Sequence, residues 1–91
     1  MKVVWSARAH RDLVAIVDYI LQDNPSAAER VGARIAEAAA SLTNMSRRGR
    51  PSRLKVGREL VLAPLPYIIE YAVGRDEVFI FHIRHGAQDV R

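Results

Sequence analysis

The sequence contains no cysteine among its 91 residues, and its apolar runs are short. Without cysteine the protein has no disulfide framework, no thiolate nucleophile and no cysteine-ligated zinc site. The apolar runs are far below the roughly 20 residues that span a bilayer, and the N-terminus lacks the pattern of a signal peptide. These absences and the short length predict one soluble cytoplasmic domain over residues 1–91.

Common catalytic and cofactor motifs are also missing. No serine lies in a G-x-S-x-G sequence, and the isolated glycines form no phosphate-binding loop. His82 and His85 are three residues apart, and strand side chains at that spacing point to opposite faces. We therefore expect no bound metal and no cofactor.

The positive charge is concentrated in one segment. The chain has a formal net charge of +4, and residues 47–58 contain six basic residues and no acidic one. These basic residues are Arg47, Arg48, Arg50, Arg53, Lys55 and Arg58. Such a block favours an acidic partner, either nucleic acid or protein, although a solvated arginine-rich loop has the same composition.

Apolar periodicity predicts two helices. A stripe of apolar residues at helical spacing indicates a helix over residues 7–22, and Ser6 is placed to cap it. Asn24 and Pro25 are typical of the start of a second helix, whose apolar residues step by three and four over residues 28–45. The tight link between the two segments predicts an antiparallel helical hairpin.

Strand-like segments precede and follow the helices. Residues 2–5 predict a first strand, and residues 59–63, 67–73 and 78–83 predict three more. Residues 47–58 predict a loop, because glycine and proline interrupt them. The order strand, helix, helix, strand, strand, strand predicts an α+β domain in which the helical hairpin packs on a small antiparallel sheet.

Metal-independent RNA cleavage is one activity that the composition allows. Such chemistry needs cations near the scissile phosphate and side chains that transfer protons. The candidate residues for this activity are Arg53, Lys55, Arg58, His82, Arg84 and His85. For His82, which lies in an apolar strand, the alternative is a hydrogen-bonded structural role.

Five segments taken in order match a known pattern: VWSARAHRDLVAIVDYI, NPSAAERV, SRRGRPSR, RELVLAPLPYIIEYAV and VFIFHIRHGAQDVR. Together they resemble the RelE/ParE superfamily of bacterial toxins from type II toxin–antitoxin systems, over essentially the whole chain. The resemblance implies the same α+β architecture. It also implies a cognate antitoxin protein, which wraps the toxin with one segment and binds promoter DNA with its other end.

The superfamily has two mechanistic branches. RelE-like members cleave mRNA in the ribosomal A site, whereas ParE-like members inhibit DNA gyrase without nuclease chemistry. The nuclease branch often carries basic residues on the strand before PYIIEY, an arginine after its first aromatic residue, and a C-terminal arginine and tyrosine. This chain has apolar residues at 60–62, Ile68, Gln88 and no following tyrosine at those places, so it resembles the ParE-like branch more closely.

The resemblance implies a toxin that binds gyrase, arrests growth, is not itself an enzyme and is neutralised by its antitoxin. Two alternatives stay open: a RelE-like, ribosome-dependent mRNA endonuclease, and a non-toxic module that regulates its own promoter with a partner. The expected target or antitoxin contacts are Arg47, Arg48, Arg50, Arg53, Lys55, Arg58, Arg84, His85, Gln88, Asp89 and Arg91. DNA would be bound only through the antitoxin, and no membrane is involved.

Overall fold

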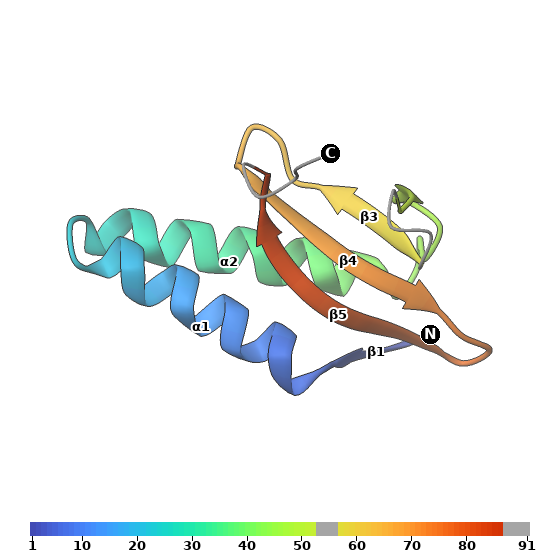
Figure 1. The fold of residues 1–91 in the computed structure, drawn as a ribbon. Helices are drawn as coiled ribbons and strands as arrows, with labels where there is room; N and C mark the ends of the chain where they lie inside the picture. Colours follow the sequence, from blue (N-terminus) through green and yellow to red (C-terminus); the bar gives the residue numbers. More distant parts are fainter. Residues whose placement is uncertain (53–56, 87–91) are drawn as a thin grey trace.

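A computed structural model describes residues 1–52 and 57–86. Its elements are β1 (Lys2–Trp5), α1 (Ala7–Leu21), α2 (Pro25–Ser41), β2 (Arg50–Pro51), β3 (Arg58–Val61), β4 (Tyr67–Val73) and β5 (Glu77–His85). The two helices run side by side against one face of the sheet (Figure 1). This arrangement confirms the predicted α+β fold. In the described ranges, neither helix has the length and apolar character that crossing a membrane requires.

Both helices begin at the predicted capping residues. Ser6 Oγ accepts a hydrogen bond from Ala9 N at 3.0 Å, and Asn24 Oδ1 accepts one from Ala27 N at 3.0 Å. Pro25 occupies the first turn of α2, where its missing N–H has no helical partner in any case. These local interactions explain why the sequence predicted the start of each helix correctly.

The helices pack closely and extend beyond the sheet. A Cβ atom at Gly32 of α2 would lie 3.1 Å from Val17 Cγ2 of α1, so glycine permits this close approach. The turn between the helices projects past the strands (Figure 1). Tyr19 and Leu21 near the end of α1 are consequently exposed.

The sheet is mixed rather than wholly antiparallel as predicted. Its strand order is β1-β5-β4-β3-β2, and β1 pairs in parallel with β5 while the other pairs are antiparallel. The parallel direction places the start of α1 beside the second half of β5. There Ser6 N donates to Ile80 O at 2.9 Å and Ser6 Oγ donates to Phe81 O at 2.9 Å.

The segment predicted as a loop contains the short strand β2. Arg50 and Pro51 pair with Glu59 and Arg58 of β3 at the edge of the sheet, where a proline is tolerated. A Cβ atom at Gly49 would lie 2.6 Å from the carbonyl oxygen of Glu59. The chain therefore approaches β3 this closely only because residue 49 is glycine.

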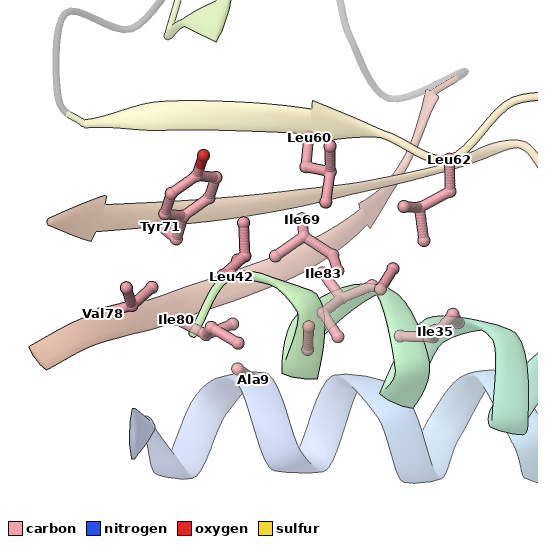
Figure 2. Close-up of a cluster of buried hydrophobic side chains, with 12 residues drawn as sticks. Ala9, Ile35, Leu42, Leu60, Leu62, Ile69, Tyr71, Val78, Ile80 and Ile83 are labelled. Atoms are coloured by element: carbon pink, nitrogen blue, oxygen red, sulfur yellow. The ribbon is translucent and has the colours of Figure 1, made fainter. Parts of the chain in front are cut away.

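The core lies between the helical hairpin and the sheet (Figure 2). Ile69 and Tyr71 from β4, Ile80 from β5, Ile35 from α2 and Leu42 after α2 are completely buried there. Alternate residues of the strands provide this face, as the alternation in residues 67–73 predicted. The opposite face of the sheet carries Glu59, Glu70 and Arg84 together with apolar Ile68.

A β-bulge at Phe81 interrupts β5. The pairing with β4 shifts between Glu70 and Tyr71, which leaves Phe81 without an opposite residue. One extra residue moves every later side chain to the other face of the sheet. Ile80 and Ile83 are consequently both buried in the core although they are three positions apart.

Candidate functional site

The predicted contact residues lie in separate places. Those outside the described residues are Arg53, Lys55, Gln88, Asp89 and Arg91. The others belong to a buried charge cluster, to an exposed turn after α2, or to a cleft beside α1.

The buried cluster is a row of charged side chains on the sheet face opposite the helices. Register places Arg50 opposite Glu59, and Glu59 opposite Glu70. Arg50 Nε donates to Glu59 Oε1 at 2.9 Å. Arg84 Nη2 donates to Glu59 Oε2 at 2.9 Å, and Arg84 Nε donates to Glu70 Oε2 at 2.5 Å. We call these four residues the ionic row.

Burial gives Arg84 a structural role. Its side chain is 7% exposed, and that of Glu59 is 0% exposed. Glu59 and Glu70 face each other across β3 and β4, and two carboxylates so placed repel each other unless a cation neutralises them. Because its guanidinium neutralises this pair, Arg84 stabilises the fold and offers no charge to a partner surface.

The exposed turn after α2 contains Arg47 and Arg48, the first two residues of the basic segment 47–58. Arg58 Nη1 donates to Gly49 O at 2.6 Å and to Arg47 O at 3.4 Å, so Arg58 holds the turn against β3. Arg48 Nη1 donates to Ser41 Oγ at 2.5 Å. Arg47 and Arg48 are both exposed and present positive charge to solvent.

A cleft of about 340 Å³ lies between α1 and the ends of β4 and β5. It is lined by Asp12, Ala15, Ile16, Tyr19, Tyr67, His82, Ile83 and His85. Both histidines line it, although their register with Glu70 and Tyr67 places them on alternate faces of β5. His82 contacts Asp12 of α1 at the cleft. Within residues 1–52 and 57–86, no three side chains of the metal-ligating types are grouped to hold an ion.

Asp12 attaches α1 to β5 within this cleft. Asp12 Oδ2 accepts a hydrogen bond from Ile83 N at 3.0 Å and lies 2.6 Å from His82 Nδ1. Arg8 Nη2 lies 3.3 Å from His82 Nε2. Because arginine only donates, His82 Nε2 is the acceptor from Arg8. We therefore assign the ring proton to Nδ1, which donates a hydrogen bond to Asp12 Oδ2. Both ring nitrogens are occupied, so the geometry suits a structural tether better than proton transfer.

Replacing Asp12 with alanine is expected to lower the free energy of unfolding by about 1.5–3 kcal/mol, because Ile83 N–H loses its charged acceptor and His82 loses its partner. Urea-induced unfolding measures the change. Asp18→Ala is the matched control, since Asp18 is an exposed carboxylate on the same helix. Equal losses in the two variants would contradict the tether.

Tyr67 forms another wall of the cleft. Its ring meets the ring of His85 edge to face, with centroids 5.5 Å apart. Partial burial, with a contribution from the charge of Tyr19, raises the pKa of Tyr67 above its ordinary value of about 10. The cleft therefore favours the neutral phenol.

The raised pKa predicts a loss of stability in alkali. Above about pH 10 the unfolded chain releases the Tyr67 proton more readily than the folded chain, so the free energy of unfolding falls as pH rises through the folded pKa. Tyr67→Phe removes this contribution, and its stability should decline less steeply between about pH 8 and about pH 11. Urea unfolding at each pH tests this. Tyr19→Phe removes only the smaller, charge contribution to the pKa of Tyr67, so it should flatten the slope less than Tyr67→Phe does. A wild-type slope in Tyr67→Phe would refute the prediction.

Comparisons with known proteins agree over nearly the whole chain. A family model described as "ParE toxin of type II toxin-antitoxin system, parDE" matches residues 3–90. "Putative toxin Y4kP" of Sinorhizobium fredii is 47% identical over 87 residues, covering 96% of this chain and 90% of the relative. "Toxin RelE2" of Caulobacter vibrioides is 47% identical over 87 residues, covering 96% and 97% respectively. A solved chain titled "Chromosomal ParDE TA system from P. aeruginosa" aligns with a TM-score of 0.85 and 28% identity, covering 93% of this chain and 95% of that chain.

Proposed function

The chain belongs to the ParE toxin family of type II toxin–antitoxin systems, and from this premise we propose that it binds DNA gyrase and blocks the cycle of that enzyme without catalysing a reaction itself. Membership confirms the family that the sequence resembles and implies an antitoxin partner. A gyrase inhibitor would act in the cytoplasm, where gyrase works on DNA.

One observation supports binding over RNA cleavage: two of the predicted catalytic cations, Arg58 and Arg84, are already bonded to other groups of the fold. A metal-independent nuclease needs cations free to stabilise a phosphate, and losing one such group costs about 3–4 kcal/mol of barrier. In the described ranges, Arg84 is buried in the ionic row, and Arg58 holds two backbone carbonyl groups. A docking surface needs neither of them, because it can use the exposed charges elsewhere.

The proposed contact surface centres on the exposed turn after α2. Arg47 and Arg48 are exposed there, and the side chain of Arg50 is 50% exposed at the end of the ionic row. Charges of this kind accelerate and orient association with an acidic partner surface. His85, which is exposed at the cleft beside α1, and the predicted residues outside the described ranges stay further contacts in this proposal.

The antitoxin would cover a different part of the molecule. β1 is the terminal strand of the sheet, so one of its edges has no neighbouring strand within the described residues. An extended antitoxin segment can pair with such an edge through backbone hydrogen bonds. We place the antitoxin on this edge and along the helical hairpin.

Supercoiling of DNA by purified gyrase, titrated with the toxin with and without ATP, tests the proposal. We expect inhibition, scored together with trapped cleaved DNA, and relief of the inhibition by the antitoxin. Arg47→Glu combined with Arg48→Glu should weaken inhibition about tenfold or more, whereas Arg75→Glu on the exposed β4–β5 turn should not. Unchanged supercoiling at a large excess of toxin would sink the proposal. Normal growth on expression without antitoxin would favour a non-toxic regulatory module.

A RelE-like mRNA endonuclease is the second candidate. It is favoured by the name of the Caulobacter relative and by the meeting of His82, His85 and Tyr67 in one cleft. This activity predicts codon-phased mRNA cuts in a translating extract, lost in His82→Ala or His85→Ala. Intact mRNA during toxic expression would rule it out.

A further inference from the structure

A second cleft opens between α2 and the connection from β3 to β4. It has a volume of about 310 Å³ and is lined by Arg30, Val31, Arg34, Pro64 and Leu65. Val31, Pro64 and Leu65 make its floor apolar. The two arginines carry all the charge of the lining, and no acidic residue is among its lining residues.

Neither arginine of this second cleft is neutralised within the described residues. Arg30 Nη1 donates to the neutral hydroxyl of Ser26 at 2.8 Å, and Arg34 is half-buried without a side-chain hydrogen bond or ion pair in those ranges. Arg50 and Arg84 contrast with them, since both are bonded to carboxylates. A guanidinium has five N–H donors in a planar fork, and a partly buried one without an acceptor is suited to an incoming carboxylate.

We propose that this second cleft docks an acidic and apolar segment of the antitoxin. An apolar side chain of the segment inserts between Val31 and Leu65, and carboxylates on either side of it pair with Arg30 and Arg34. The charge of the lining favours this occupant over a basic segment, and the apolar floor favours it over a purely charged one. The inference rests on the toxin–antitoxin part of the proposed function and does not depend on gyrase as the target.

The spacing of the arginines specifies the partner further. Arg30 and Arg34 are four residues apart on α2, which corresponds to about 6 Å along the helix axis. Carboxylates four apart on a partner helix have the same spacing, and carboxylates two apart on an extended segment are about 6.6 Å apart. On an extended segment the residue between the two carboxylates points to the opposite face, so a helix fits the second cleft. The segment should therefore carry two acidic residues four apart on a helix, with a leucine, isoleucine or phenylalanine three residues after the first, on the same face.

Isothermal titration of the toxin with its purified antitoxin tests the inference. Arg30→Gln combined with Arg34→Gln should weaken binding about 10- to 100-fold and reduce the dependence of Kd on salt. Arg34→Gln alone should weaken binding more than Arg75→Gln, the matched control that removes one positive charge from an exposed turn outside the second cleft. Thermal unfolding of each free variant checks that the substitutions leave the fold intact. Arg34→Glu on the toxin should weaken binding to the wild-type antitoxin. Replacing the opposing acid of the antitoxin with lysine should restore part of the affinity for this variant.

Several outcomes would overturn the inference. Binding by the double variant within about twofold of the wild type is one, and an equal loss in Arg75→Gln, which indicates general charge attraction, is another. Self-association of the wild type that the double variant lacks would assign the cleft to a second copy instead. Gyrase inhibition measured without antitoxin should be unchanged in the double variant. If the wild type fails to inhibit gyrase while the double variant loses antitoxin binding, the gyrase proposal fails and this inference stands.

Discussion

Replacing Arg84 with alanine is expected to lower the free energy of unfolding by about 3–5 kcal/mol, a large part of the stability of a domain of this size. The substitution leaves Glu59 and Glu70 facing each other in a buried position without the cation that lies between them. Glu59 keeps its bond to Arg50, but Glu70 loses the guanidinium that is bonded to it and keeps its desolvation penalty. Arg84 was predicted as a contact or catalytic residue, and this result would assign it to stability.

Urea-induced unfolding of the wild type and of Arg84→Ala measures the effect. Arg75→Ala, at an exposed position, should change stability by no more than about 0.5 kcal/mol. Adding Glu59→Gln and Glu70→Gln to Arg84→Ala should recover much of the loss, because the uncompensated charges are then gone. A deficit below about 1 kcal/mol at neutral pH would contradict the structural role.

Replacing Tyr71 with alanine is expected to cost about 3–5 kcal/mol of unfolding free energy. Tyr71 is fully buried, and Figure 2 shows its ring beside β4 with the hydroxyl directed toward β3. Its hydroxyl oxygen accepts a hydrogen bond from Gly49 N at 2.8 Å, which fixes the turn after α2 against the sheet. Alanine removes both the packing and this anchor.

Tyr71→Phe separates the two contributions. It keeps the ring but leaves the buried Gly49 N–H without its acceptor, so we expect a loss of about 1–2 kcal/mol. Tyr19→Ala is the control for truncating a tyrosine, since Tyr19 is 72% exposed and should lose little. Thermal or urea unfolding of the three variants gives the comparison. Equal stability for Tyr71→Phe and the wild type would show that water replaces the hydroxyl.

The helices and the long strands were predictable because their signals are local. The caps at Ser6 and Asn24 and the apolar periods lie within a few residues of the elements that they specify. The parallel pairing of β1 was missed, because nothing near residues 2–5 indicates which strand they join. β2 was missed because two residues in a proline- and glycine-rich segment carry no periodicity.

The candidate site was less predictable, because its interactions join distant segments. Simple alternation along β5 puts Arg84 on the same face as Val78 and Ile80, and only the bulge moves it to the ionic row. His82 meets Asp12 across 70 positions of the sequence. The polar residues could be selected from the sequence as candidates, but their partners, and hence their roles, depended on the tertiary structure.

The parallel pairing of β1 also has a consequence for the order of folding. Ser6 and Phe81, which bond at the end of this pairing, are 75 positions apart, whereas the helical hairpin and the β3–β4–β5 meander close much shorter loops. Closing the longest loop is entropically slowest, so β1 should dock late, and a four-residue edge strand should detach with little other structure lost. Each detachment uncovers the backbone edge of β5 and loosens the start of α1. The last strand to join the sheet is thus also the one through which the fold can open transiently.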